Sequence, residues 1–217
     1  MLQRLRDAVL HGDREQALEL TEQALAQGVL AGEIVDTSLT PAMDQVGDEY
    51  DHGDRFIPEM LMSGEVAKAV LDGLRPMLID GSREAGGTVA IGTVEGDLHD
   101  IGKSLVAMML QGAGFSVVDL GVEVPTERFV EFVTEQKPDI LALSALLTTT
   151  MVHMADVIDG LKEAGLRDQV GVIVGGAPVT GEFADRIGAD GYAPDAPSAV
   201  RLVRKLMQAA SRDHVGS

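Results

Sequence analysis

Hydrophobic positions in the first third of the chain recur at the spacing of amphipathic helices. Apolar residues fall on one helical face over residues 5–25, and Gly28 follows the run, as glycine commonly does at a helix end: Leu5, Val9, Ala17, Leu18, Leu20, Ala24 and Leu25. A third helix is predicted over Ala31–Tyr50, with Pro41 as a kink or a restart because proline lacks a backbone N–H. A fourth is predicted over Pro58–Ile79. The short connections favour an antiparallel four-helix bundle.

From Thr88 the pattern changes to short apolar segments that alternate with helical ones. Strands are predicted at 88–94, 115–121, 140–146, 170–176 and 190–193, and helices at 102–111, 126–136, 149–164, 181–187 and 196–209. This alternation is typical of an α/β domain with a parallel, doubly wound sheet, and five strands favour the flavodoxin-like (Rossmann-like) order 2-1-3-4-5. The polar sequence DGSREAGG before Thr88 indicates a boundary. The predicted domains are a helical bundle at 1–80, a linker at 81–87 and an α/β domain at 88–217.

Chemically distinctive residues stand where three of the predicted strands end. Asp97, His99 and Asp100 follow the first strand, Ser144 and Leu146 end the third, and Gly175 and Gly176 end the fourth. Ligands of doubly wound sheets bind at the carboxyl edge near the point where the strand order reverses, so these residues are expected to form one site. An aspartate close to a histidine can accept a hydrogen bond from one ring nitrogen and leave the other for a metal.

Two common uses of such a loop do not match the sequence. Gly102-Lys103-Ser104 opens a helix as a phosphate-binding loop does, but the spacing from Gly96 is one residue too long, and two aspartates would oppose a triphosphate. A phospho-acceptor receiver domain needs an aspartate at the end of its third strand, where this chain has Ser144-Ala145-Leu146. A purely structural role for His99 stays open if the histidine is considered alone.

Composition and charge exclude several kinds of metal site and binding partner. The chain has no cysteine, so neither a disulfide nor a thiolate metal site can form. The net charge of -18 opposes binding to nucleic acid and to anionic membranes. No secretory signal and no membrane-spanning run is recognisable, which favours a cytoplasmic protein. No other histidine accompanies His99 at ligand spacing, and a metal that needs one protein ligand normally arrives in a macrocycle.

At these residues the chain resembles the cobalamin-binding domain of methionine synthase and of the corrinoid proteins of methyltransferase systems. The family motif is D-x-H-x-x-G, then S-x-L, then G-G. It stands here as Asp97-Leu98-His99-Asp100-Ile101-Gly102, Ser144-Ala145-Leu146 and Gly175-Gly176. The spacings between the three blocks also match, and the resemblance covers roughly residues 3–208.

The resemblance implies a role for each of these residues toward a cobalamin or related corrinoid bound base-off/His-on. His99 would replace the nucleotide base as the lower axial ligand of cobalt, oriented by Asp97 and, through it, by the hydroxyl of Thr150. The displaced nucleotide tail would enter the edge of the sheet beside small or apolar residues. The other cofactor-binding positions implied are Leu98, Asp100, Ile101, Gly102, Ser144, Leu146, Thr148, Gly175, Gly176, Tyr192 and Ala196.

The helical half resembles the cap domain of the same family. The match spans Met43–Pro76 and implies that four residues overlie the methyl-bearing face of the cofactor: Tyr50, Phe56, Ile57 and Met60. An apolar cover protects a reactive cobalt centre from water. Membership of the ordinary bundle core is the alternative for these four residues.

A stand-alone corrinoid methyl carrier is the function that the resemblance implies, as a non-autonomous subunit of a methyltransferase system. A substrate-specific methyltransferase would place a methyl group on Co(I), and a second methyltransferase, acting on a pterin or thiol, would remove it from methyl-Co(III). A reductive activase is a further implied partner, and the linker is the expected hinge. The alternative is a cobalamin-binding sensor or storage module without methyl transfer. The motif is common to both, and the methyl donor, acceptor, lower base and oligomeric state stay open.

Overall fold

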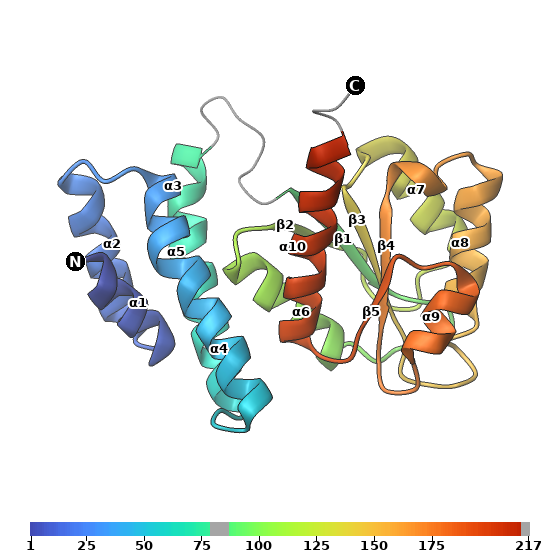
Figure 1. Ribbon diagram of the computed structural model, residues 1–217, viewed down its shortest axis with the longest axis horizontal. Coiled ribbons are helices and arrows are strands. Elements are labelled where there is room, and N and C mark those ends of the chain that lie inside the picture. The colour runs from blue at the N-terminus through green and yellow to red at the C-terminus, as the bar shows by residue number, and fades with distance from the viewer. Residues whose placement is uncertain (79–86, 214–217) are drawn as a thin grey trace. The chain divides into compact units, whose positions relative to one another are not determined.

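A computed structural model describes residues 1–78 and 87–213 of the chain. Two compact units are present (Figure 1). The helices of the first 78 residues and Met108–Ser116 form one unit, and Gly87–Ala107 and the chain from Val117 form the other. The predicted linker 81–87 is described only at Gly87, so the domain boundary stays a prediction.

The helical unit contains the four helical runs that the hydrophobic pattern predicts. They are α1 (Leu2–Leu10), α2 (Arg14–Ala26), a third run made of α3 (Ala31–Ile34), η1 (Val35–Leu39) and α4 (Thr40–His52), and α5 (Ile57–Leu78). The third run is continuous, but η1 is π-helical. Pro41 lies in the first turn of α4, where its missing N–H is tolerated. The proline therefore marks a restart, and Gly53 ends α4 with a φ of 78°.

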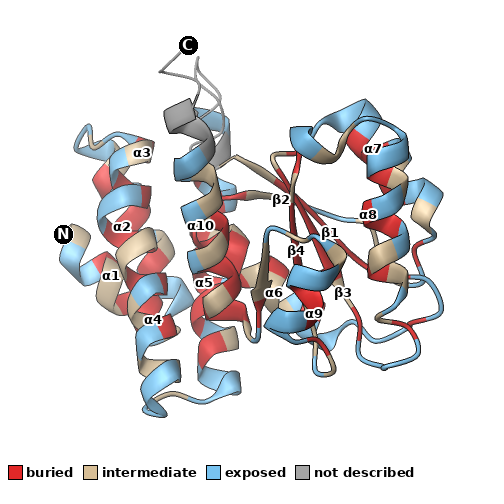
Figure 2. Ribbon diagram, turned by 45° about the vertical axis from the view of Figure 1, so that its right-hand side comes forward, coloured by how far each residue is buried: buried red, intermediate tan, exposed pale blue. Residues whose placement is uncertain are grey.

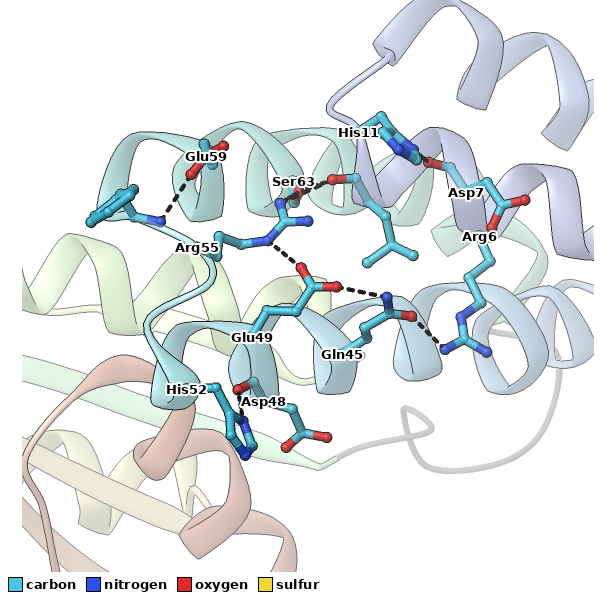
Figure 3. A network of polar contacts seen from close by, with 12 residues as sticks. Arg6, Asp7, His11, Gln45, Asp48, Glu49, His52, Arg55, Glu59 and Ser63 are labelled. Carbon is cyan, nitrogen blue, oxygen red and sulfur yellow. Dashed lines mark hydrogen bonds and ion pairs between the residues drawn. The ribbon is translucent and has the colours of Figure 1, made fainter.

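A network of polar side chains joins the helices next to the loop between α4 and α5 (Figure 3). Arg55, in that loop, donates from Nε to Glu49 Oε2 at 2.8 Å and from Nη1 to the Leu10 carbonyl at 3.0 Å and to Ser63 Oγ at 3.1 Å. Gln45 Nε2 donates to the other Glu49 oxygen at 2.7 Å. The arginine thereby ties the loop to α1, α4 and α5.

We expect Glu49→Gln to destabilise the helical unit in a pH-dependent way. The Gln45 hydrogen bond is the main cause that lowers the pKa of Glu49; burial opposes it, and Arg55 lowers it further. The carboxylate therefore contributes stability above its unfolded pKa of about 4.3, and this contribution is lost as the pH falls through the lower folded pKa. Near neutral pH the substitution should lower the free energy of unfolding by about 1 kcal/mol, and the difference should shrink in acid.

Urea unfolding followed by far-UV circular dichroism at several pH values measures this effect. Glu131→Gln is the matched control, because Glu131 pairs with Arg128 at 2.8 Å with both side chains about half exposed. Exposed pairs contribute roughly 0–1 kcal/mol. Equal, pH-independent losses in the two variants would contradict the assignment.

The α/β unit is built on a five-stranded sheet in the order β2-β1-β3-β4-β5, which confirms the order predicted from the sequence. The strands are β1 (Thr88–Thr93), β2 (Ser116–Asp119), β3 (Ile140–Ser144), β4 (Gly171–Gly175) and β5 (Gly191–Ala193). At their carboxyl ends one row crosses the sheet, because Thr93 pairs with Ser144, Ser144 with Gly175 and Gly175 with Ala193. The parallel sheet thus places the residues of several distant motifs along one edge.

Helices cover both faces of this sheet, as in other doubly wound folds (Figure 1). They are α7 (Thr126–Gln136), α8 (His153–Glu163), α9 (Gly181–Ile187) and α10 (Ala196–Asp213), with a 3-10 turn η2 (Arg167–Gln169), and α6 (Ile101–Gly112), whose residues from Met108 on belong to the first unit. One core cluster packs α7, α8 and α9 against alternate strand residues such as Ala90, Leu141 and Val172. The central strands and the inner faces of these helices are accordingly buried (Figure 2). Among the helices of the described ranges, none is long and apolar enough to cross a membrane.

Candidate cofactor site

Asp97 is the most constrained residue of the loop between β1 and α6. Its side chain is fully buried although it carries a carboxylate. The backbone is held as well, because the Asp97 N–H donates to the Val94 carbonyl at 3.2 Å and the Glu123 N–H donates to the Asp97 carbonyl at 2.9 Å. A buried carboxylate is stable only if hydrogen bonds replace its lost hydration.

The Asp97 carboxylate joins the loop after β1 to the loop after β3. Its Oδ1 accepts the His99 backbone N–H at 3.0 Å and interacts with His99 Nδ1 at 2.7 Å. Its Oδ2 accepts the Leu146 N–H at 2.7 Å and the Thr150 hydroxyl at 2.6 Å. The structure therefore brings together Asp97, His99, Leu146 and Thr150, which the sequence places in two separate motifs.

These contacts fix the proton arrangement of the pair. Burial raises the pKa of Asp97, but the hydrogen bonds from Thr150, Leu146 and His99 outweigh it and hold the pKa well below its usual value. A carboxylate can only accept hydrogen bonds, so the proton between the two residues belongs to Nδ1 of His99. In the neutral imidazole Nε2 then carries a lone pair. This is the tautomer that a metal ligand requires.

His99 lies at the surface of the α/β unit. Its side chain is 52% exposed. Large apolar side chains are exposed in the same two loops and at the adjoining ends of α6 and α8, with Leu98 68% and Ile101 85% exposed: Leu98, Ile101, Leu146, Leu147 and Val152. An exposed apolar group of this kind marks a binding surface. Its combination with one metal-ligating nitrogen suits a large, flat, mainly apolar cofactor.

Glycines leave the backbone bare where β4 ends. A Cβ on Gly176, whose φ is 124°, would lie 1.9 Å from the Ala145 carbonyl oxygen, and a Cβ on Gly175 would lie 2.8 Å from the Ala193 carbonyl oxygen. Only glycine lets these backbone segments approach so closely. Gly102, in contrast, is exposed, and a Cβ there would meet no atom within 4 Å. The two glycines therefore let the ends of β3, β4 and β5 pack closely at this edge of the sheet.

The remaining residues that the resemblance implies in the α/β unit differ in how far they are buried. Ser144 is partly buried at the end of β3, while Asp100 and Thr148 are exposed in their loops. Tyr192, on β5, packs against the core cluster. Ala196 begins α10 and is 3% exposed, so its side chain is part of the packing there.

The four implied cap residues differ in exposure within the helical unit. Phe56, in the loop that Arg55 anchors, is 70% exposed, and Ile57, the first residue of α5, is 48% exposed. Tyr50 is partly buried. Met60 is only 1% exposed, which fits the alternative that it belongs to the bundle core.

Sequence reasoning missed parts of this site and misplaced one helix. The helix predicted to begin at Thr149 begins at His153, because residues 148–152 form turns that carry the Thr150 hydroxyl to Asp97. The fully buried Thr93, whose hydroxyl donates to the His99 carbonyl at 3.0 Å, was not recognised. A hydroxyl residue that ends an otherwise apolar buried strand is the signal that could have revealed it.

The groups available to hold a cofactor indicate the class of protein. Within residues 1–78 and 87–213, no group of three or more His, Asp or Glu residues is arranged to hold a bare metal ion. The site offers one oriented imidazole, an apolar surface and a glycine-lined sheet edge. These features fit a macrocyclic metal cofactor with an attached tail, and they define a cofactor-binding protein of the doubly wound class.

Comparisons with known proteins name the family. Models described as "B12 binding domain" match residues 87–201 and residues 1–75. The chain is 44% identical to trimethylamine corrinoid protein 1 of Methanosarcina acetivorans, over 95% of this chain and 97% of the relative.

Solved structures agree with this match over both units. A cobalamin-binding protein from Desulfitobacterium hafniense DCB-2 has a TM-score of 0.81 and 34% identity over 95% of this chain and 98% of its own. The methanol:cobalamin methyltransferase complex MtaBC from Methanosarcina barkeri matches with a TM-score of 0.82 and 29% identity, over 94% of this chain and 78% of its own. The chain belongs to the B12-binding family of corrinoid proteins.

Proposed function

We propose that this protein is the methyl carrier of a corrinoid-dependent methyltransferase system. A substrate-specific methyltransferase supplies the methyl group, and a second methyltransferase transfers it to a pterin or thiol. When bound, the corrinoid provides the cobalt that carries the methyl group between the two. The observation that carries the proposal is the Asp97-oriented imidazole of His99 at the carboxyl edge of the sheet. The trimethylamine corrinoid relative and the methanol methyltransferase complex support a methylated amine or alcohol as donor.

The chain's own residues have defined tasks in this proposal. His99 would hold the cobalt through Nε2, in the base-off/His-on mode. Asp97 holds the imidazole in the required tautomer, and the Thr150 hydroxyl, 2.6 Å from Asp97, helps to keep Asp97 ionised. Nε2 of His99 can hold either a proton or the metal, so ligation by the Thr150–Asp97–His99 chain would depend on pH.

The helical unit acts in this proposal as the cap of the cofactor. Of the four implied cap residues, Phe56 and Ile57 are the exposed ones, and they would shield the reactive face from water. The cap would have to move aside for each partner. The hinge expected from the sequence, 81–87, lies outside the described residues except for Gly87. A reductive activase that rescues oxidised cofactor completes the partner set, and we place the system in the cytoplasm.

Methyl transfer in a reconstituted system tests the proposal. The purified protein is loaded with hydroxocobalamin, reduced chemically and mixed with candidate methyltransferases and methylated amines, methanol or aryl methyl ethers. We expect one enzyme–donor combination to methylate the bound cobalt, as seen in its absorbance spectrum. A cobalamin sensor or store would bind the cofactor equally well and stay inert in every combination, and that result would overturn the carrier function.

A further inference from the structure

The hydroxyl of Thr93 contacts the histidine residue directly. Thr93 ends β1 and is fully buried, and its Oγ1 donates to the backbone carbonyl of His99 at 3.0 Å. A hydroxyl buried among apolar strand residues must have a partner to be tolerated. Here that partner is the carbonyl group of the predicted cobalt ligand.

With this bond, His99 is held at three atoms. Asp97 Oδ1 accepts both its backbone N–H at 3.0 Å and its Nδ1–H at 2.7 Å, and Thr93 donates to its carbonyl oxygen. The Asp97 contacts alone leave the carbonyl side of the residue, and hence the direction of the Cα–Cβ bond, less constrained. Metal affinity depends on such orientation, because a ligand that must be ordered on binding loses free energy.

Thr93 is itself fixed by the loop on the other side of β1. Its backbone N–H donates to the Gly121 carbonyl at 3.0 Å, and its carbonyl accepts the Val124 N–H at 3.0 Å. Glu123, between these two residues, donates its N–H to the Asp97 carbonyl at 2.9 Å. The same short loop therefore supports both residues that hold His99.

We propose that Thr93 is a positioning residue for the cobalt ligand, whose hydroxyl presets the backbone of His99 so that Nε2 faces the metal. The inference rests on the proposed function, because it takes His99 as the axial ligand. It adds a constraint on the carbonyl group of His99 to the two contacts that Asp97 makes with the ring and with the backbone N–H. A side chain of equal shape without the hydroxyl should fill the site but hold the imidazole less well.

Thr93→Val provides the direct test, because valine keeps the shape and removes only the hydroxyl. Thr93→Ser keeps the hydroxyl, and Thr21→Val is the matched control. Thr21 is also buried and donates to a carbonyl, that of Ala17, at 2.7 Å, but it lies on α2. The readouts are cobalamin retention on gel filtration and, in the cobalt(II) form of protein labelled with nitrogen-15 histidine, the doublet hyperfine splitting of a histidine nitrogen, which differs from the triplet that the cofactor's own unlabelled base gives.

We expect Thr93→Val to release cobalamin about tenfold faster and to show a smaller histidine-ligated fraction. Losses of this size commonly follow the removal of a residue that orients a metal ligand. Thr93→Ser and Thr21→Val should both match the wild-type protein in cobalamin retention and in the histidine-ligated fraction. A Thr93→Val protein with unchanged splitting and retention would overturn the positioning role. So would equal losses in Thr21→Val, because the effect would then be one of general stability.

Two further outcomes of this experiment also have a defined interpretation. If Thr93→Val does not fold, the comparison of Thr93→Ser with Thr93→Ala replaces it, with the same expected contrast and the same disproof. If the wild-type protein itself shows no doublet from a histidine nitrogen, the proposed axial role of His99 fails, and the inference about Thr93 fails with it. A failure confined to the Thr93 variants leaves the proposed function standing.

Discussion

Replacing His99 with alanine is expected to leave the fold intact and to convert bound cobalamin into a water-ligated form that is lost readily. The side chain is 52% exposed, so its removal creates no core cavity. The Asp97 carboxylate keeps its hydrogen bonds from the backbone N–H of residue 99, from Leu146 and from Thr150. In the proposed function His99 is the axial ligand, so we expect at least the roughly 10–100-fold loss of affinity that follows removal of outer contacts to a metal ligand.

The absorbance spectrum and the retention of cobalamin on gel filtration measure this effect. His153→Ala is a matched control from the same unit, because His153 also pairs with a carboxylate, Asp156, at 2.9 Å. It starts α8 and is not part of the motif. We expect the control to match the original protein. An unchanged spectrum and retention in His99→Ala would show that axial ligation by this residue is wrong.

Asp97→Asn is expected to have the largest effect on stability and to impair ligation as well. The amide offers one acceptor oxygen where the carboxylate offers two. If that oxygen faces His99, the amide nitrogen faces the Leu146 N–H, which loses its 2.7 Å bond. If the amide is turned around, the His99 N–H loses its acceptor and Nδ1 must accept instead, which moves the ring proton to the metal-binding Nε2. Each orientation leaves a buried donor unpaired, at a cost of about 1–3 kcal/mol.

The lowered pKa of Asp97 determines how the stability difference between the two proteins changes with pH. The pKa of Asp97 is lowered on folding, so its contribution is present above the unfolded pKa of about 3.9 and is lost as the pH falls through the folded value. We therefore expect the apo-protein with Asp97→Asn to be about 3 kcal/mol less stable near neutral pH, with the difference shrinking in acid.

Chemical unfolding of the wild-type and Asp97→Asn apo-proteins, from neutral pH down into acid, measures the difference. Asp139→Asn is the control, because Asp139 accepts one backbone N–H, that of Thr88, at 2.8 Å in the same unit. It should cost less and leave cobalamin binding unchanged. Equal losses from the two substitutions, or a difference that grows in acid, would contradict the role given to Asp97.

Much of the fold could be predicted because its periodicities are local. The helices at Thr126–Gln136 and Gly181–Ile187 have the predicted bounds, since glycine, proline and polar residues delimit them in the sequence. The strand order also followed, because a parallel α/β chain has few allowed topologies. The start of α8 could not be predicted, because Thr150 is drawn into a turn by an aspartate that is 53 residues away.

The sequence by itself determined the alternation of strands and helices, the single-histidine motif and the family resemblance, because these depend on residue types at fixed spacings. Only the tertiary structure decided which atoms hold His99. It showed that Asp97 is fully buried and bonded to the loop after β3, and that the Thr93 hydroxyl reaches the His99 carbonyl. It also separated the exposed Phe56 from the buried Met60. Burial and hydrogen-bond partners depend on segments far apart in the chain, and local patterns carry no information about their distance.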